Sequence, residues 1–345
     1  MKWIKNKSEI IFIPLLFGIL YLLQTTGILN GYIMQVLLLV GINIMMTQSL
    51  NLITGLAGQP SLGHAGFMSI GAYSAASITT IFFNVTAMAP ALQIVFFLVA
   101  TAFGGICAAL FGLLIGIPTL RLKGDYLAIV TLGFGELIRS IIRIVPAIGG
   151  ARGLIGIPKL AGLFWIFLFA VITIYVCRNF MDSLYGRSAI AIRENNIAAD
   201  TMGINVSRYK VITFVFSAFI AGVAGSLYAH TIQFVQPDIF SSIKSTEFLV
   251  YLYAGGVGSI SGSILGAFML TILPELLRFL STWRLVIYGV LLVCVILFRP
   301  LGLFGGREFA FLKLNTGGIR NVGFRSFRRK NKDNAAEKPV DKEAE

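Results

Sequence analysis

Long apolar stretches separated by short polar loops follow one another along most of this sequence. Many of them approach or exceed the roughly 20 residues that an α-helix needs to cross a bilayer. The pattern predicts helices over residues 31–53, 61–83, 91–117, 125–145, 163–180 and 211–232, with a further set between residues 247 and 298. An earlier apolar run, residues 10–23, follows three lysines and has no small-residue cleavage site after it, which predicts an uncleaved first span. We therefore expect an all-α, polytopic transmembrane helical bundle.

The charges of the loops predict the orientation of these spans. The loop at residues 84–90 carries no charge, whereas residues 178–210 carry several arginines and lysines. Because cytoplasmic loops are enriched in these residues, we place the second loop in the cytoplasm of a multi-pass protein of the plasma or inner membrane. Residues 1–9 then form a short cytoplasmic N-terminus and residues 10–305 the transmembrane domain. Residues 306–345 form a basic cytoplasmic tail, which we expect to be disordered near anionic lipid headgroups.

Composition supports the membrane class and excludes several others. Hydrophobic residues make up 57% of the 345 positions, charged residues 12%, and the mean hydropathy is +0.85. The net charge of +13 could indicate nucleic-acid binding, but the basic residues concentrate in loops and in the tail, so we expect no nucleic-acid partner. Three scattered cysteines and two histidines favour neither a disulfide framework nor a metal site, and we expect no cofactor. The sequence lacks a G-x-x-x-x-G-K-[ST] loop, so we expect neither enzymatic activity nor nucleotide hydrolysis by that route.

Glycines interrupt three of the apolar stretches, at residues 60–71, 131–136 and 254–266. Unwound backbone is tolerated at membrane depth only where it is buried in protein or lines a wet cavity. The interruptions therefore predict discontinuous or half-membrane helices beside a translocation path. An alternative is that the small residues only let helices pack closely. The candidate path residues are Ser61, His64, Ser69, Thr131, Glu136, Gly255, Gly258 and Ser259.

The few ionisable residues within apolar stretches are candidates for function because a charge inside a bilayer is unfavourable. Glu136 and Arg139 lie three residues apart, which predicts a self-neutralising pair on one helical face. For His64 we favour a structural hydrogen bond to a freed backbone carbonyl. We place His230 at the membrane interface. The alternative is that Glu136 or His64 is the proton site of an ion-coupled secondary transporter.

A polar loop in this apolar chain, residues 181–210, requires an explanation outside the bilayer. Asn196 is suited to cap a short helix over residues 197–202, and Gly203 to end it in the left-handed conformation. Ala198 and Ala199 would keep the surface of this helix low, so that a groove of a partner protein could approach its backbone. The candidate residues of the loop are Gly186, Arg187, Arg193, Glu194, Asn196, Ala198, Ala199 and Gly203.

The end of this loop resembles the E-A-A-x-x-x-G coupling motif of ABC importer permeases, with Ile197 in place of the acid and without the hydrophobic-proline ending. Further stretches resemble the permeases of branched-chain amino-acid ABC importers, in particular their LivM-type subunit. They are S-L-N-L at residues 49–52, S-L-G-H-A-G-F at 61–67, L-K-G-D-Y-L-A-I-V-T-L-G-F-G-E at 122–136, A-G-x-A-G-S-L-Y at 221–228, G-G-x-G-S-x-x-G at 255–262 and F-R-P-L-G-L-F-G at 298–305.

The resemblance implies a permease subunit with several protein partners. These are a second, homologous permease subunit, two ABC ATPases that bind the polar loop, and an extracytoplasmic solute-binding protein. The implied cargo is leucine, isoleucine and valine, whereas near relatives carry urea and short amides. An ion-coupled secondary transporter and a structural membrane subunit stay open as alternatives, although neither explains the capped polar helix.

Overall fold

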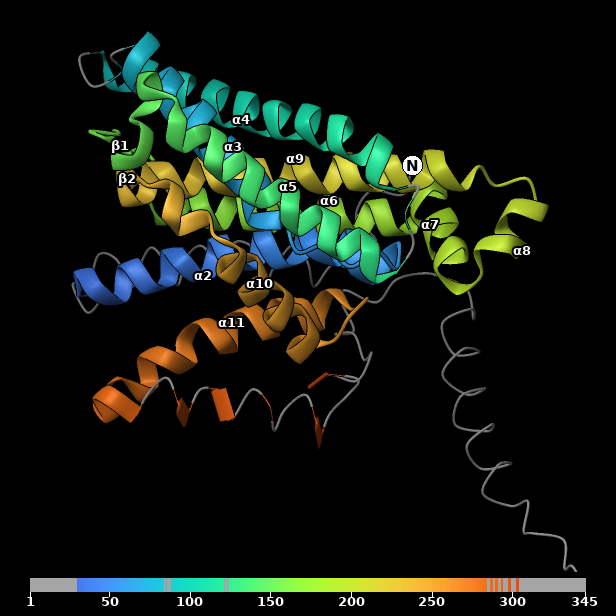
Figure 1. Ribbon diagram of the computed structural model, residues 1–345. Helices are drawn as coiled ribbons and strands as arrows, with labels where there is room; N and C mark the ends of the chain where they lie inside the picture. The colour runs from blue at the N-terminus through green and yellow to red at the C-terminus, as the bar shows by residue number, and fades with distance from the viewer. Residues whose placement is uncertain are drawn as a thin grey trace, which may run out of the picture. The chain divides into compact units, whose positions relative to one another are not determined.

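The computed structural model describes residues 30–83, 85, 88–120, 122, 124–283 and a few positions between 286 and 303. The predicted span at residues 10–23, both chain ends and most of residues 284–312 therefore lie outside the described residues. The described part falls within one compact unit and is helical almost throughout, as Figure 1 shows. The long helices are α2 (Gly31–Leu50), α3 (His64–Ser77), α4 (Pro90–Thr119), α5 (Asp125–Ile144), α6 (Leu163–Asp182), α9 (Val206–Ile232), α10 (Ser242–Gly255) and α11 (Ile260–Leu276).

Shorter elements extend or connect these helices. The π-helices η1 (Asn51–Leu56) and η2 (Ile78–Phe82) continue α2 and α3 and lie outside the predicted interruptions. The interruption predicted at residues 131–136 was wrong, because these residues form regular α-helix within α5. Two short helices, α7 (Leu184–Glu194) and α8 (Asn196–Thr201), form the polar loop. The remaining elements are the 3-10 helices η4 (Pro146–Ile148), η5 (Gly150–Arg152), η6 (Pro237–Phe240) and η7 (Leu277–Trp283), and the strands β1 (Leu154–Ile155) and β2 (Phe234–Val235).

Six of the described helical segments are long and apolar enough to cross a membrane. They correspond to α2 with η1, α3 with η2, α4, α6, α9, and α11 with the start of η7. The predicted helix over residues 125–145 is present as α5, but α5 is not one of the six. Its polar face carries Glu136, Arg139 and Arg143, so it packs as an amphipathic helix. The predicted helix is confirmed, and its assignment as a span stays a prediction.

The longest described interior helix, α9, connects two different ends of the bundle. The polar loop with α7 and α8 precedes α9, and β2 follows it (Figure 1). With 27 residues, α9 separates these ends by roughly 40 Å. At its far end β2 pairs antiparallel with β1, with Leu154 opposite Val235 and Ile155 opposite Phe234. The bundle thus has a polar-loop end and an opposite end that carries the paired strands β1 and β2. We call the second one the hairpin end, although the two strands are far apart in the sequence.

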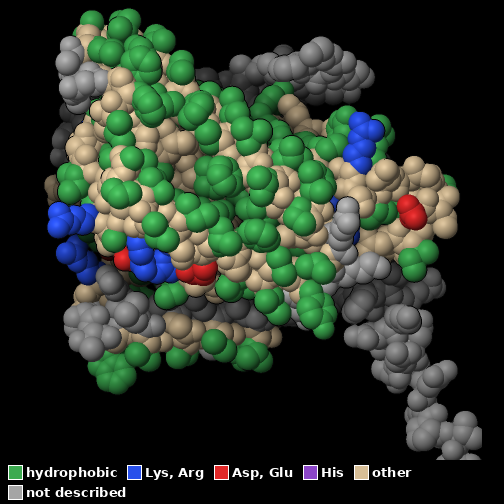
Figure 2. Space-filling model, turned by 45° about the horizontal axis from the view of Figure 1, so that its top comes forward, with side chains coloured by type: hydrophobic (Ala, Val, Ile, Leu, Met, Phe, Trp, Pro, Cys, Tyr) green, Lys and Arg blue, Asp and Glu red, His purple; other side chains and the backbone are tan. Residues whose placement is uncertain are grey.

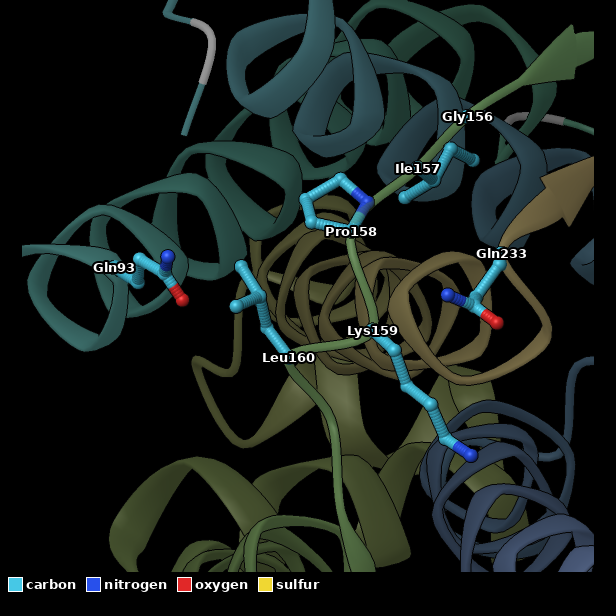
Figure 3. A pocket seen from close by; sticks show the side chains of 7 residues that line it. All are labelled: Gln93, Gly156, Ile157, Pro158, Lys159, Leu160 and Gln233. Atoms are coloured by element: carbon cyan, nitrogen blue, oxygen red, sulfur yellow. The ribbon is translucent and has the colours of Figure 1, made fainter. Parts of the chain in front are cut away.

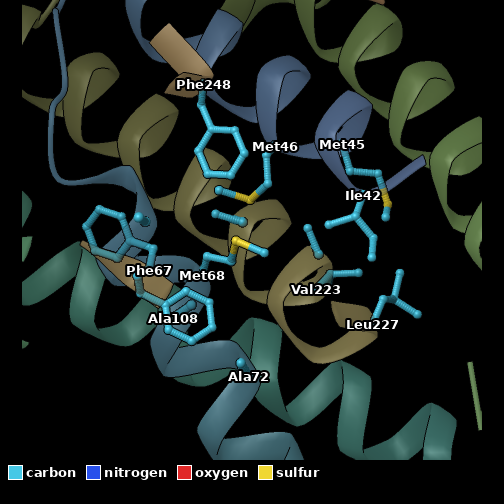
Figure 4. Packing of buried hydrophobic residues seen from close by; sticks show 14 of the residues in the cluster. Ile42, Met45, Met46, Phe67, Met68, Ala72, Ala108, Val223, Leu227 and Phe248 are labelled. Carbon is cyan, nitrogen blue, oxygen red and sulfur yellow. The ribbon is translucent and has the colours of Figure 1, made fainter. Parts of the chain in front are cut away.

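Close contact between α3, α4 and α9 depends on glycine. A Cβ atom on Gly71 would collide with the backbone of Gly222, and one on Gly225 would collide with the carbonyl oxygen of Met68. The small residues thus let helix backbones approach each other, as in other membrane bundles. Around this contact lies the core shown in Figure 4, to which α2, α3, α4, α9 and α10 contribute Ile42, Met45, Met46, Phe67, Met68, Ala72, Ala108, Val223, Leu227 and Phe248.

The outer surface of α4 is apolar. Its exposed side chains include Leu98, Phe103 and Leu114, and no Asp, Glu, Lys or Arg occurs between Pro90 and Thr119. Figure 2 shows a face covered mainly by hydrophobic side chains and backbone, with charged side chains toward its edges. A water-soluble protein would not leave such a surface uncovered. The chain is therefore a multi-pass membrane protein.

Helices α10 and α11 form an antiparallel pair joined by a tight turn at residues 256–259. Gly255 lies so close to Gly262 and Gly266 that a side chain on any of the three would meet backbone. At the other end of α11, the side chain of Glu275 accepts a hydrogen bond from Tyr32 at the start of α2. The turn thus points toward the polar-loop end, and the far end of α11 returns to the hairpin end.

Candidate functional site

The polar loop is folded by two capping side chains. The Ser183 hydroxyl accepts a hydrogen bond from the backbone N–H of Gly186 and starts α7. The amide oxygen of Asn195 accepts from the N–H groups of Ile197 (3.0 Å) and Ala198 (3.1 Å) and starts α8. The prediction that Asn196 caps this helix was wrong by one residue. Asn195 has extended backbone dihedrals, as a capping residue requires, whereas Asn196 is the first helical residue.

The end of α8 agrees with the prediction for Gly203. This residue has a φ of +81°, and its N–H donates to the carbonyl oxygen of Asp200 (2.9 Å). The N–H of Ile204 donates to the carbonyl oxygen of Ala199 (3.1 Å). These two bonds form a Schellman motif, in which a left-handed residue satisfies the last carbonyl groups of a helix. Both ends of this six-residue helix are therefore fixed without any contact to a partner.

The surface of α8 differs from the prediction. Ala199 is 4% exposed because it faces the rest of the chain, so it does not present a low surface to a partner. Two large apolar side chains project instead: Ile197 is 77% exposed and Met202 is 82% exposed. Ile197 and Met202 could be noticed in the sequence because they are large apolar residues in a polar segment. The direction in which they point depends on which residue caps α8.

Arg193, at the end of α7, connects the polar loop to the helical bundle. Its Nη1 atom donates to the carbonyl oxygen of Gly55 (2.6 Å), and its Nη2 atom pairs with Glu194 (2.7 Å). Gly55 lies in η1, the π-helical continuation of α2. Arg187 is exposed on the other side of α7, and Gly186 packs against the backbone of Phe180 and Met181.

The turn between α10 and α11 contacts the same part of η1. The N–H of Gly258 donates to the side-chain oxygen of Asn51 (2.8 Å), and the side-chain nitrogen of Asn51 donates to the carbonyl oxygen of Ser259 (3.3 Å). The Ser259 hydroxyl in turn accepts from the N–H of Gly262 and caps α11. The connection at residues 57–63 overlaps the predicted interruption at residues 60–71, and the Gly258 turn lies within the one predicted at residues 254–266. Both lie beside Arg193.

A small cavity separates the polar loop from the connection between η1 and α3. Its volume is about 80 Å³. Its lining comes from the connection, from the start of α5, from the polar loop and from α9, and includes Gln59, Leu127, Arg193, Asn196 and Lys210.

The connection from η1 to α3 contains buried polar groups without partners. Both polar atoms of the Gln59 side chain, the Ser61 hydroxyl and the Nδ1 atom of His64 are buried and have no hydrogen-bond partner. The Nε2 atom of His64 does have one, the Oγ atom of Ser49 at 2.8 Å. The histidine thus joins α3 to α2, and its partner is a hydroxyl rather than the predicted backbone carbonyl; its structural role stays a prediction.

Two further candidate path residues, Ser69 and Thr131, are buried and take part in local hydrogen bonds. The Ser69 hydroxyl donates to the carbonyl oxygen of Gly66 (2.6 Å), and the Thr131 hydroxyl donates to that of Ala128 (2.9 Å). Thr131 also accepts from the N–H of Leu62 (3.1 Å) and so ties α5 to the connection. These contacts, like those of Gly255, are of the kind expected from the alternative interpretation, in which the small residues let helices pack closely. Exposure of these residues to a path stays a prediction.

Glu136 forms the predicted pair with Arg139, at 2.7 Å. Its second carboxylate oxygen accepts from the N–H of Ser242 at the start of α10 (3.0 Å). Arg139 and Arg143 also pair with Asp238 on η6, a partner that sequence spacing could not indicate. The Arg143 guanidinium holds the pKa of the Asp238 carboxyl below its usual range. His230, predicted at the membrane interface, is instead buried, where it contacts the Thr79 hydroxyl and the Ser226 carbonyl oxygen.

The hairpin end carries a larger, open pocket of about 470 Å³ (Figure 3). It lies between the start of α4, the segment after β1 and the residue that ends α9. Gln93, Lys159 and Gln233 supply its polar side chains, and Ile157, Pro158 and Leu160 its apolar ones. Gln233 has a φ of +63° and ends α9 in the left-handed conformation. Within the described residues, no group of three or more His, Cys, Asp and Glu could hold a metal ion.

Comparison with known proteins supports the resemblance that the motifs indicate. Residues 32–296 match the protein family described as "Branched-chain amino acid transport system / permease component". The chain belongs to this permease family. It is 33% identical over 297 residues to the high-affinity branched-chain amino acid transport system permease protein LivM of Escherichia coli K12, covering 76% of this chain and 67% of that protein.

Two further relatives match different shares of this permease. It is 25% identical to a probable LivM protein of Methanocaldococcus jannaschii, over 79% of this chain and 92% of that protein. It is 32% identical to the LivH permease protein of E. coli K12 over 157 residues, 44% of this chain and 49% of that protein. No solved structure matches.

Proposed function

We propose that this chain is the membrane-spanning permease subunit of an ATP-driven, binding-protein-dependent importer of leucine, isoleucine and valine. The observation that carries the proposal is α8, a helix capped at both ends that projects Ile197 and Met202 from a bundle otherwise suited to lipid. Exposed apolar side chains on a rigid, polar loop outside the spans are suited to a protein partner. The branched-chain cargo is inferred from the names of the relatives.

The partners follow from the same reasoning. We assign the polar loop to the cytoplasm, as the docking site for two ABC ATPase subunits, and we assign both chain termini to that side. The hairpin end then faces outward, toward an extracytoplasmic solute-binding protein. A second permease subunit would complete the membrane part, in line with the existence of both LivM and LivH relatives. ATP hydrolysis belongs to the partner subunits.

Reconstitution tests the energy source and the cargo together. The chain is co-expressed with a second permease, ATPases and a secreted binding protein of the same organism, and the purified complex is placed in liposomes. We expect uptake of radiolabelled leucine that requires ATP and the binding protein and that persists when a protonophore removes the proton gradient. Uptake that follows the proton gradient at constant ATP would favour a secondary transporter. Uptake of urea or short amides instead of leucine would correct the cargo.

Cysteine labelling tests the path. The native cysteines are replaced, and single cysteines are placed at Ser61, Ser69, Thr131 and Ser259, which are all buried in this conformation. We expect a small water-soluble thiol reagent to modify them in at least one nucleotide state, because a transport cycle must expose its path to water. Protection of all four positions in every state would place the path elsewhere.

A further inference from the structure

Arg193 is the residue at which the polar loop meets two interrupted helices. Its guanidinium donates to the carbonyl oxygen of Gly55 at 2.6 Å. Its side-chain stem lies against Gly58, where a Cβ atom would be 3.3 Å from the Cβ atom of Arg193. The Nη1 atom also lies 3.3 Å from the position of a Cβ atom on Gly258. One side chain therefore contacts η1, the connection to α3, and the turn between α10 and α11.

Asn51 joins two of these segments, η1 and the turn between α10 and α11. Its side chain bridges η1 to the N–H of Gly258 and to the carbonyl oxygen of Ser259. A displacement of η1 is consequently passed to the α10–α11 turn. Arg193 binds Gly55, which lies one turn beyond Asn51 in η1. The position of Arg193 therefore determines how η1 and the α10–α11 turn lie relative to α7.

The connection that Arg193 contacts has reason to adopt a second arrangement. Gln59 and Ser61 are buried with unpartnered side-chain atoms, which is unfavourable and uncommon in proteins. The cavity of about 80 Å³ lies beside both Gln59 and Arg193, so the connection has space to move. An arrangement that gave these polar groups partners would be favoured once the contact to Gly55 was broken.

We propose that Arg193 is a positioning residue that couples the polar loop to the interrupted helices. While it binds the Gly55 carbonyl, it holds the connection and the α10–α11 turn in the arrangement seen here. A movement of α7 by a docked partner withdraws the guanidinium and releases both segments. The proposal rests on the proposed function, since it takes the docked partner to be the ATPase.

The reconstituted complex tests this role through the ratio of uptake to ATP hydrolysis. Arg193→Gln removes the guanidinium, and Arg193→Lys keeps a charge with a single donor group. Arg152→Gln is the matched control, because Arg152 is an exposed arginine in η5, outside the polar loop. For Arg193→Gln we expect ATPases to stay bound and hydrolysis to continue, while leucine uptake per ATP falls about tenfold, equivalent to about 1.4 kcal/mol. Arg193→Lys should be intermediate, and Arg152→Gln should retain the wild-type ratio.

Two results would overturn the coupling role. One is an unchanged ratio in Arg193→Gln. The other is loss of the ATPases with a normal ratio in the complexes that remain, since Arg193 would then belong to the docking surface. If the wild-type complex itself neither retains ATPases nor uses ATP, the proposed function fails instead, and the two failures are thereby distinguished.

A labelling measurement in native membranes keeps the test independent of purification. In a background without native cysteines, Ser61→Cys is labelled with a water-soluble thiol reagent, with and without Arg193→Gln. Release of the connection should raise the labelling rate several-fold. The same rate in both backgrounds would contradict the proposal.

Discussion

The Nε2 atom of His64 lies 2.8 Å from the Oγ atom of Ser49, and this contact joins the first turn of α3 to the end of α2. Ser49 donates its own proton to the carbonyl oxygen of Ser217 on α9 (2.6 Å). The hydroxyl must therefore accept from His64, which places the imidazole proton on Nε2. Three helices thus share one polar contact inside an apolar bundle.

This contact predicts different effects for two substitutions at position 64. His64→Leu removes the donor and should lower the free energy of unfolding by about 1–3 kcal/mol, because Ser49 loses a buried partner. His64→Gln places an amide N–H near the position of Nε2 and should retain most of the stability. Thermal unfolding in one detergent checks both variants. Equal losses in the two would show that the ring shape, rather than the donor, matters.

The cap of α8 predicts a difference between neighbouring asparagines. Asn195→Ala removes the acceptor for the N–H groups of Ile197 and Ala198 and should destabilise α8 by about 1 kcal/mol. Asn196→Ala should have little effect on the helix, because that side chain caps nothing. Hydrogen exchange measured by mass spectrometry should show faster exchange over residues 196–202 only in the first variant. The reverse result would restore Asn196 as the cap.

The exposed side chains of α8 predict the energetics of docking. Ile197→Glu adds a charge to the surface that we assign to the ATPase, so the ATPases should dissociate more readily during purification while the permease stays abundant in the membrane. Ala199→Glu is a different test, because Ala199 is buried and its replacement should disrupt the polar loop itself. Normal ATPase retention in Ile197→Glu would remove α8 from the interface.

The close approach of α3 and α9 predicts that Gly225 cannot be replaced. Gly225→Ala would place a methyl group against the carbonyl oxygen of Met68, and the overpacking should cost about 1–3 kcal/mol and lower the abundance of folded protein. Gly133→Ala on α5 is the control, since nothing lies within 4 Å of its Cβ position. Alanine favours a helix over glycine by up to about 1 kcal/mol, so this control should be neutral or stabilising. Size-exclusion profiles of both variants provide the comparison.

The ion pairs of Asp238 predict a pH dependence at the hairpin end. Arg143 and Arg139 lower the pKa of the Asp238 carboxyl from the ordinary 3.8, so its contribution to stability is complete above that value. It is lost as the pH falls through the lower pKa of the folded protein. The unfolding temperatures of wild type and Asp238→Asn are measured at neutral pH and below pH 4. They should differ at neutral pH and converge as the pH falls. A difference that stays constant with pH would show that the charge of Asp238 is unimportant.

Most of the helical fold could be predicted from hydropathy, because each buried or lipid-facing helix needs a long apolar run. For α5, hydropathy predicted the helix but not its ion pairs. Glu136, Arg139 and Arg143 lie on one face, and the two arginines pair with Asp238, which is about a hundred positions away and on no predicted element. Long-range partners of this kind, like those of His230, leave no periodic signal in a sequence.

The position of the short capped helix in the polar loop was predicted from the sequence. Its capping residue and its contacts to the bundle were predicted less well. Helix-end chemistry identified Gly203, because few other residues adopt a left-handed backbone readily. The choice between Asn195 and Asn196 depended on a backbone conformation that adjacent identical residues cannot reveal. The contact between Arg193 and Gly55 joins positions 138 residues apart and follows only from the assembled helices.

The short helix α10 has a consequence for how this protein is made. Its 14 residues span roughly 21 Å, less than the roughly 30 Å hydrocarbon core, and its terminal backbone groups are satisfied by other parts of the chain. A segment of this kind cannot leave the insertion machinery as an independent span. It has to wait for α11, its antiparallel partner, and then enter a bundle that α2, α3 and α5 have already formed. The insertion of α10 into the membrane is therefore also a folding step.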